Sequence, residues 1–186
     1  MVSGPFAVAE KIFVRDSAEA DLAAVQAIYG HHVLHGTGSF ETEPPDLAAM
    51  TERRAALLAQ GYPHMVAVDA GGTVVGFAYA GPFRPRAAFR YTVEDSVYVA
   101  PGQQGKGVGR ALLSVLVARC EADGFRQMVA VIGDSANAGS IALHGALGFR
   151  PSGSLTAAGF KFGRWVDVVF MQRPLGPGAD APPEQR

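Results

Sequence analysis

The chain carries the stretch Gln104-Gly105-Lys106-Gly107-Val108-Gly109-Arg110 between a strand-like segment, 96–99, and an apolar, helix-like segment, 111–117. Its three glycines stand at every second position, which removes the Cβ atoms that would hold a ligand away from the backbone. Several N–H groups can then converge on phosphate oxygens, and the unpaired N-terminal amides of the following helix add to them. The stretch therefore predicts an anion-binding loop at the start of a helix.

Two other phosphate loops do not fit this stretch. A Walker A loop ends in Gly-Lys-Ser/Thr, but here Gly107 follows Lys106 and has no hydroxyl for a magnesium ion. A dinucleotide fingerprint read from Gly105 needs a small residue where the chain has Arg110. The pattern that fits is Gln/Arg-x-x-Gly-x-Gly/Ala, filled by Gln104, Gly107 and Gly109, although an ordinary strand-to-helix turn also uses glycine.

Length and composition predict one domain. At 186 residues with 48% hydrophobic content, the chain can bury a sizeable core. We expect the domain over residues 11–175, after an N-terminal extension over 1–10. The segment 176–186 has three prolines and almost no apolar content, so we expect a disordered tail.

The charge balance limits the partners. Sixteen basic and seventeen acidic residues leave a formal net charge of −1, so no global field attracts nucleic acid or an anionic membrane. No apolar run approaches the ~18 residues of a membrane span, and residues 1–9 are too short and lightly charged for a signal peptide. A single cysteine, Cys120, excludes internal disulfides. We therefore predict a cytoplasmic protein without nucleic-acid or membrane partners.

Apolar periodicity and turn residues predict seven strands and four helices. The predicted strands span 11–15, 65–69, 73–80, a segment ending at 99, 127–132, 149–155 and 166–173. The first helix follows a capping-box spacing at Asp16 and Glu19, and the second begins at the cap Asp46. The third runs from the glycine loop to about residue 124, and the fourth spans 140–147. Gly81-Pro82 is expected to end the third strand.

Five further segments occur in an order that resembles one protein family. They are Ser39–Pro44, Ala78–Phe83, Thr92–Val99, His144–Phe149 and Phe162–Asp167. With the glycine loop, they resemble the GCN5-related N-acetyltransferase (GNAT) family, and within it the phosphinothricin and methionine sulfoximine N-acetyltransferases. The resemblance implies an α/β (α+β) fold with a mixed, mostly antiparallel sheet, splayed fourth and fifth strands and about four helices. It also implies acetyl-coenzyme A as cosubstrate and no metal.

The implied reaction needs a base and benefits from an acid. An α-ammonium with a pKa of ~8 is mostly protonated at neutral pH, so a proton must leave before the amine attacks the thioester. Glu94 matches the catalytic glutamate of this branch, whereas the side chain of Asp95 should point to the opposite face of its strand. His144 matches a histidine of the branch where other relatives have a tyrosine acid; it is either the proton donor to the thiolate or a packed helix residue.

The resemblance also implies the residues that hold acetyl-coenzyme A. Backbone groups of the fourth strand pair with the pantetheine arm, and the glycine loop holds the pyrophosphate. Asn137 resembles the asparagine that binds the arm, although it is also a suitable helix cap. The cofactor residues are Val97, Tyr98, Val99, Gln104, Gly105, Lys106, Gly107, Val108, Gly109, Arg110 and Asn137. Cys120 lies mid-helix beyond the loop, which favours direct transfer over an acetyl-cysteine intermediate.

The acceptor pocket is predicted from the loop before Glu94. Guanidinium groups there can bind the carboxylate of an amino acid-like acceptor. The substrate-binding residues are Arg84, Arg86, Ser96, Phe40 and Phe83. Two alternatives stay open: an acetyltransferase for a peptide or polyamine, and an acyl-coenzyme A-binding module without turnover. The resemblance and the apolar segment 168–171, approached by aromatic residues over 160–165, predict a homodimer.

Overall fold

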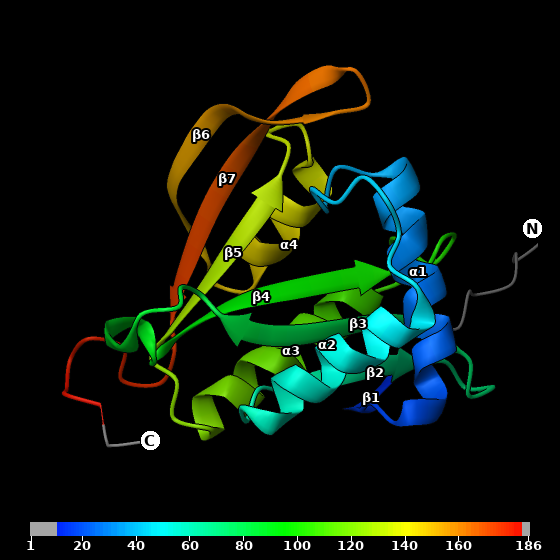
Figure 1. The fold of residues 1–186 in the computed structure, drawn as a ribbon. Helices are drawn as coiled ribbons and strands as arrows, with labels where there is room; N and C mark the ends of the chain where they lie inside the picture. Colours follow the sequence, from blue (N-terminus) through cyan, green and yellow to red (C-terminus); the bar gives the residue numbers. More distant parts are fainter. Residues whose placement is uncertain (1–10, 184–186) are drawn as a thin grey trace, which may run out of the picture.

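The computed structural model describes residues 11–183, so the predicted extension over 1–10 and the last three residues of the tail lie outside the described residues. One mixed sheet has the strand order β1-β2-β3-β4-β5-β7-β6 (Figure 1). The strands are β1 (Phe13–Asp16), β2 (His64–Val68), β3 (Val74–Pro82), β4 (Thr92–Val99), β5 (Gln127–Gly133), β6 (Arg150–Lys161) and β7 (Arg164–Pro174). The α-helices are α1 (Leu22–His35), α2 (Leu47–Ala59), α3 (Val108–Ala122) and α4 (Ala138–Ala146). The predicted order of elements is confirmed.

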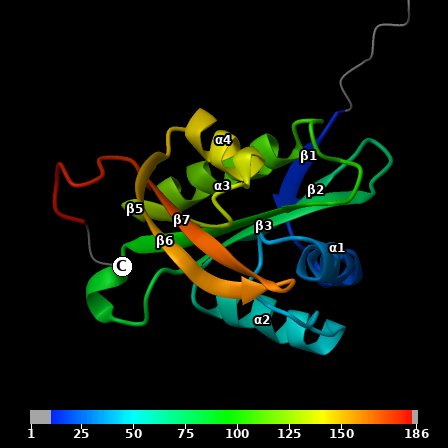
Figure 2. The same ribbon diagram turned by 90° about the horizontal axis from the view of Figure 1, so that it is seen from above.

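The helices cover both faces of the sheet: α1 and α2 lie on one face and α3 and α4 on the other (Figure 2). On the first face, the ring of Tyr29 in α1 packs edge-on against Tyr98 in β4, with 5.1 Å between centroids. On the second face, α3 approaches β3 closely at Gly76. A Cβ atom there would lie 2.9 Å from both the Tyr98 carbonyl oxygen and Val108 Cγ1, so this contact requires glycine.

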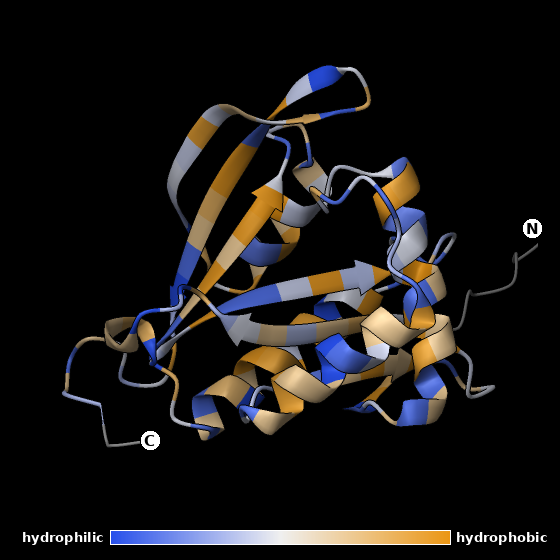
Figure 3. Cartoon of the chain, in the orientation of Figure 1, coloured by the Kyte–Doolittle hydropathy of each residue, from blue (hydrophilic) through white to orange (hydrophobic). Residues whose placement is uncertain are grey.

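The strand β5 lies in the middle of the molecule and is coloured as hydrophobic along most of its length (Figure 3). Successive residues Met128, Val129 and Ala130 are all buried, although they point alternately to the two faces. Such a continuous apolar run is typical of a strand covered on both sides. Its partner β4 therefore pairs with a buried strand from Thr92 to Asp95.

Three predicted boundaries are wrong in detail. The proposed cap of Asp16 and Glu19 is not formed; instead Asp21 Oδ2 accepts a hydrogen bond from the Ala18 N–H at 2.7 Å. The strand β3 continues through Gly81-Pro82, where Gly81 pairs with Glu94, because a proline is tolerated at the last position of a strand. The strand β6 extends to Lys161 rather than to Leu155, and its pairing with β7 is interrupted by two irregularities.

Within residues 11–183, no helix is long and apolar enough to cross a membrane. In the same part of the chain, no group of three or more His, Cys, Asp or Glu side chains could hold a metal ion. The segment after β7 turns back on the domain, where the Arg126 Nε donates to the Gly178 carbonyl oxygen at 3.0 Å. The division into an extension, a domain and a tail stays a prediction.

Candidate active site

The site is an opening between β4 and β5. These parallel strands pair from Thr92 with Gln127 to Asp95 with Ala130, and then they diverge (Figure 1). The predicted splay is thus confirmed, and a cleft of about 1060 Å³ lies at the opening. Its walls are the outer halves of both strands, the start of α3, α4 and the loop 36–41. Backbone groups on the two facing edges are available to an extended ligand, in the manner of an added strand.

The glycine loop forms one end of the cleft. Gly105 and Gly107 adopt left-handed conformations with φ of 76° and 85°, and Gly107 is the N-terminal cap of α3. Gly109 has a different role, because it lies in the first turn of α3 and a Cβ atom there would be 3.1 Å from Leu143 Cδ2. Two glycines therefore shape the loop, and the third lets α3 pack against α4.

Most predicted cofactor residues line the cleft. From the strand these are Val97, Tyr98 and Val99, and from the loop and helices they are Gln104, Gly105, Gly107, Val108, Gly109, Arg110 and Asn137. Lys106 is exposed and lies outside the lining. Asn137 caps α4 through its Oδ1, which accepts from the Ser140 N–H at 3.2 Å. The Val99 carbonyl oxygen accepts a hydrogen bond from His32 Nε2 at 2.8 Å.

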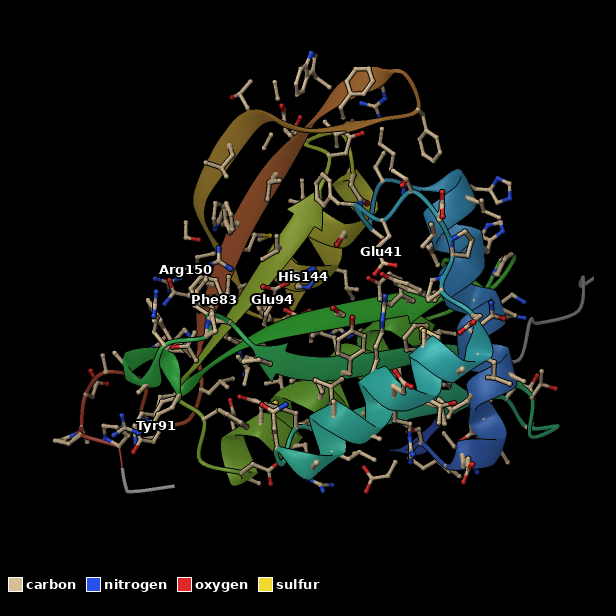
Figure 4. All side chains as sticks on the ribbon, viewed as in Figure 1. Glu41, Phe83, Tyr91, Glu94, His144 and Arg150 are labelled. Atoms are coloured by element: carbon tan, nitrogen blue, oxygen red, sulfur yellow. The ribbon has the colours of Figure 1, made fainter. Side chains whose placement is uncertain are left out.

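Glu94 lies half-buried in the cleft, on the wall formed by β4. Figure 4 shows Glu94 and His144 next to each other, between Glu41 on one side and Phe83 and Arg150 on the other. Burial raises the pKa of Glu94, the charge of Arg84 lowers it, and the charge of Asp95 raises it, with a net upward shift. A carboxylate with a raised pKa is better matched to accepting a proton near neutral pH.

Asp95 and His144 form a buried pair that the sequence did not predict. The His144 Nε2 lies 3.0 Å from Asp95 Oδ2, and the two side chains are 5% and 2% exposed. Burial alone would lower the pKa of His144, but the hydrogen bond and charge of Asp95 outweigh it and raise that pKa. The alternation of side chains places Asp95 on the face of β4 that carries Val93 and Val97. The signal that was missed is that a buried acid on this face requires a partner.

The predicted substrate-binding residues fall into two groups. Phe40 and Ser96 line the cleft, whereas Phe83, Arg84 and Arg86 do not. The two arginines are exposed, and the Arg84 guanidinium lies over the ring of Phe83 at 4.5 Å. The structure thus brings Glu94 and Ser96 together in the cleft and leaves both arginines on the adjoining loop.

The loop 36–41 contributes cleft residues that were also missed. Glu41 Oε1 accepts hydrogen bonds from Tyr29 Oη at 3.0 Å and from Arg53 Nη1 at 2.7 Å. The buried Lys161 of β6 donates to the carbonyl oxygens of Gly36 at 2.9 Å and Ser39 at 2.6 Å. The two contacts of Lys161 join residues more than 120 positions apart, so no local sequence signal predicts them.

Comparison with known proteins identifies the class of protein that this fold and cleft define. The family model described as "Acetyltransferase (GNAT) family" matches residues 26–149, and the chain belongs to this family. A phosphinothricin N-acetyltransferase from Alcaligenes faecalis is 52% identical over 171 residues, covering 92% of this chain and 86% of that protein. An L-methionine sulfoximine/L-methionine sulfone acetyltransferase from Pseudomonas aeruginosa is 48% identical, covering 91% and 98%.

A solved structure is similar as well. The complex of a phosphinothricin acetyltransferase from Sinorhizobium meliloti with acetyl-coenzyme A aligns with a TM-score of 0.91 and 49% identity. The alignment covers 96% of this chain and 95% of that chain. The predicted GNAT fold and acetyltransferase class are confirmed.

Proposed function

We propose that this protein transfers the acetyl group of acetyl-coenzyme A to the α-amino group of a small, amino acid-like acceptor. The acceptor is of the phosphinothricin, methionine sulfoximine or methionine sulfone type. One observation carries the proposal: a half-buried carboxylate, Glu94, lies in the cleft that opens between β4 and β5 and ends at the glycine loop. The relatives described above, a phosphinothricin N-acetyltransferase and an L-methionine sulfoximine/L-methionine sulfone acetyltransferase, support the choice of acceptor.

The residues present suit acetyl-coenzyme A. The left-handed glycines at positions 105 and 107 leave open space, since a Cβ atom at either position would meet nothing within 4 Å. The loop can therefore receive a pyrophosphate, with Arg110 supplying a positive charge at the cleft. The facing edges of β4 and β5 would pair with the amides of the pantetheine arm, and Asn137 would contribute its side-chain amide.

In the proposed reaction, Glu94 removes a proton from the acceptor ammonium, directly or through water. The free amine then attacks the thioester carbon, its nitrogen releases its second proton to water, and the C–S bond breaks with its electron pair passing to sulfur. His144 supplies the proton that turns the thiolate into free coenzyme A. Cys120 is buried in α3 and is absent from the cleft lining, so the transfer proceeds without an acetylated cysteine.

We propose that the acceptor is recognised by the loop that carries Arg84 and Arg86 together with the wall of the cleft. The charge of Arg84 lowers the pKa of Glu94, so this arginine influences the part of the cleft in which the acceptor amine would be deprotonated. A modest movement of this exposed loop would let Arg84 or Arg86 bind a substrate carboxylate. A second candidate acceptor is a different amine, because Glu41 and Glu94 are both acidic and line the same cleft. Because Glu41 forms an ion pair with Arg53, the cleft has less net negative charge to attract a cationic amine.

We also propose a homodimer formed through β6 and β7. Four large apolar side chains project from this hairpin region with exposures of 53–63%, namely Leu155, Phe160, Phe162 and Trp165. The rings of Phe160 and Trp165 contact each other edge-on, with 5.3 Å between centroids. Such aromatic residues are enriched at protein interfaces, and a second copy of this chain would cover them.

The acceptor is tested by measuring thiol release from acetyl-coenzyme A with a panel of acceptors. The panel contains phosphinothricin, methionine sulfoximine, methionine sulfone, a proteinogenic amino acid, a short peptide and spermidine. We expect the highest kcat/KM with one of the first three compounds. A preference for the peptide or for spermidine would overturn the proposed acceptor class, and no release with any compound would favour a binding module.

A further inference from the structure

The loop 36–41 crosses the opening between β4 and β5. It continues from α1, whose Tyr29 ring packs against Tyr98 of β4, and it reaches the far end of β5 (Figure 1). A Cβ atom at Gly133, the last residue of β5, would collide with the Thr37 carbonyl oxygen, so the loop lies directly on the strand backbone there. The loop therefore links the two halves of the sheet beyond the point where β4 and β5 stop pairing.

Lys161 of β6 holds this loop in place. Its Nζ donates to the carbonyl oxygens of Gly36 at 2.9 Å and Ser39 at 2.6 Å. Lys161 is 4% exposed, and Ser39 is buried as well. A buried ammonium is costly without hydrogen-bond acceptors, and a buried carbonyl oxygen is costly without a donor. The lysine and the loop therefore depend on each other.

A second contact of β6 fixes the ring of Phe40. A Cβ atom at Gly159 would lie 2.5 Å from Phe40 Cε1, and one at Gly133 would lie 3.3 Å from Phe40 Cε2. Neither glycine has a positive φ, so glycine is required at both positions by the close approach of the loop. Gly159 and Lys161 are two residues apart in β6 and present the same face to the loop 36–41.

The anchored loop forms the wall of the cleft near Glu94. All six loop residues line the cleft, as does Glu94, whereas Lys161 does not. Burial raises the pKa of Tyr79 most, and the charges of Glu94 and Glu41 both add to this rise. Glu94 and the end of the loop thus act on the same tyrosine, in the part of the cleft in which the acceptor amine would be deprotonated.

We infer that Lys161 is a positioning residue for the acceptor, because it anchors the loop 36–41 across the opening and so fixes the wall that the acceptor contacts beside Glu94. This inference rests on the proposed function. Lys161 lies outside the cleft lining, so it transfers no proton and acts through the loop alone. An ordered loop spares the acceptor the cost of ordering it on binding. Loss of the anchor should therefore weaken binding equally in the ground state and in the transition state.

The first test needs no acceptor. Amide hydrogen exchange, measured by mass spectrometry, reports local opening of the loop. Lys161→Met keeps a long, unbranched side chain but removes the charge and the donors. We expect peptides that cover the loop 36–41 to exchange at least about 10-fold faster in this variant, while peptides from β4 and β5 are unchanged. Equal exchange of the loop in the variant and the wild type would overturn the inference.

The matched control is Arg126→Met. Arg126 is also a cation that donates to two backbone carbonyl oxygens of a distant segment, those of Gly178 at 3.0 Å and Ala181 at 2.5 Å. All three residues lie outside the cleft lining. This variant should leave the exchange of the loop 36–41 as in the wild type. Equally fast loop exchange in Arg126→Met would show that the loss of Lys161 acts by general destabilisation, and would contradict a specific anchor.

Kinetics then separates positioning from catalysis. With the acceptor of highest kcat/KM, Lys161→Met should raise the acceptor KM by at least about 10-fold. The kcat at saturating acceptor and the Kd of acetyl-coenzyme A should stay within about 2-fold of the wild type. A lower kcat with an unchanged KM would mean that Lys161 affects the chemical step, and an equally weakened Kd would mean that the loop serves the cofactor. Either result would overturn the inference.

A second variant, Gly159→Ala, perturbs the same loop without changing Lys161. Its added methyl group would displace the ring of Phe40, so the acceptor KM should rise while kcat stays the same. This variant also tests the inference if Lys161→Met fails to fold. A wild-type KM in Gly159→Ala would show that the placement of the loop does not govern acceptor binding.

The two proposals fail in different ways. If no compound of the panel is acetylated but the loop exchanges faster in Lys161→Met, the proposed function fails and the anchoring of the loop stands. If acetylation is efficient but Lys161→Met has the loop exchange and the acceptor KM of the wild type, the function stands and the role of Lys161 fails.

Discussion

The carboxylates of Glu94 and Asp95 are consecutive in β4 but face opposite sides of the sheet, and their surroundings differ accordingly. Glu94 is half-buried in the cleft within the field of Arg84, whereas Asp95 is buried against His144. The alternation of side chains along a strand thus supplies two different acid–base environments from adjacent residues. Asp95 lies on the α4 face, where it contacts His144, and Glu94 points to the opposite face.

The role of Glu94 is tested by Glu94→Gln, which keeps the shape of the side chain but removes its basicity. We expect kcat/KM to fall by ~10²-fold, while acetyl-coenzyme A binding measured by calorimetry is unchanged. The exposed Glu43, which is outside the cleft lining, provides the control Glu43→Gln. Near-normal turnover of Glu94→Gln at pH 7 would mean that Glu94 only shapes the pocket.

The influence of Arg84 on Glu94 predicts a shift in the pH profile. Because Arg84 lowers the pKa of Glu94, Arg84→Ala should raise that pKa further. The base must be ionised, so activity is lost as pH falls through this pKa, and the loss should begin at a higher pH in the variant. Arg86→Ala, in the same exposed loop, should lack this shift. An unchanged acidic limb in Arg84→Ala would refute the coupling.

The glycine loop offers a pair of matched substitutions. Gly102 and Gly105 have similar left-handed conformations, with φ of 74° and 76°, and open space around the Cβ position, but only Gly105 lines the cleft. Asparagine tolerates this conformation, so Gly102→Asn and Gly105→Asn should fold equally well. Calorimetry should show acetyl-coenzyme A binding weakened by at least about 10-fold in Gly105→Asn alone. Equal affinities would argue against pyrophosphate binding here.

The stability of the fold should depend on pH through His64 in β2. Burial, and then the charge of Arg54, lower the pKa of His64 to about 4, and its Nδ1 lies 2.9 Å from Ser17 Oγ. In the unfolded chain this pKa is about 6.5. Stability is therefore full above about pH 6.5 and falls as the pH drops toward about 4, by about 3 kcal/mol. Urea unfolding at several pH values should show this loss.

His64→Gln should flatten that dependence, because the side chain no longer titrates. His35→Gln, which changes an exposed histidine at the end of α1, should leave the slope as in the wild type. The same slope in His64→Gln and the wild type would show that another group governs acid unfolding.

The dimer is tested by light scattering at micromolar concentration. The wild type should have twice the monomer mass of 19.4 kDa, and the double variant Phe160→Ser with Trp165→Ser should approach the monomer mass. Phe13→Ser removes an exposed aromatic ring from β1, at the other edge of the sheet, and should leave the mass unchanged. A monomer mass for the wild type would contradict the proposed homodimer.

Much of the fold could be predicted because its signals are local. Hydrophobic periodicity located the helices, and the glycine spacing before Val108 located the loop. The length of β6 could not be read in this way, since Gly153 and Ala157 have positive φ values and interrupt the alternation. Its partner β7 extends it, through pairs such as Phe160 with Trp165. This pairing depends on long-range contacts rather than on propensity.

The residues of the candidate site could be predicted from segments that resemble the family, but the contacts between these distant residues could not. Glu94 and His144 belong to separate matching segments, and both indeed line one cleft. The bond of His144 to Asp95 joins residues 49 positions apart, and its existence depends on the depth at which α4 packs. Similarly, exposure of Arg84 depends on the course of its loop, which composition does not determine.

The separation of β4 from β5 has a consequence for solubility. Unpaired strand edges normally invite pairing with other chains, and proteins protect such edges by covering or shortening them. Here two strand edges that do not pair with each other lie inside a single sheet, and α4 and the loop 36–41 flank them. Because these flanking segments cover the edges, they are protected from pairing with the sheet of another protein. The fold therefore offers strand pairing to a ligand without offering it to aggregation.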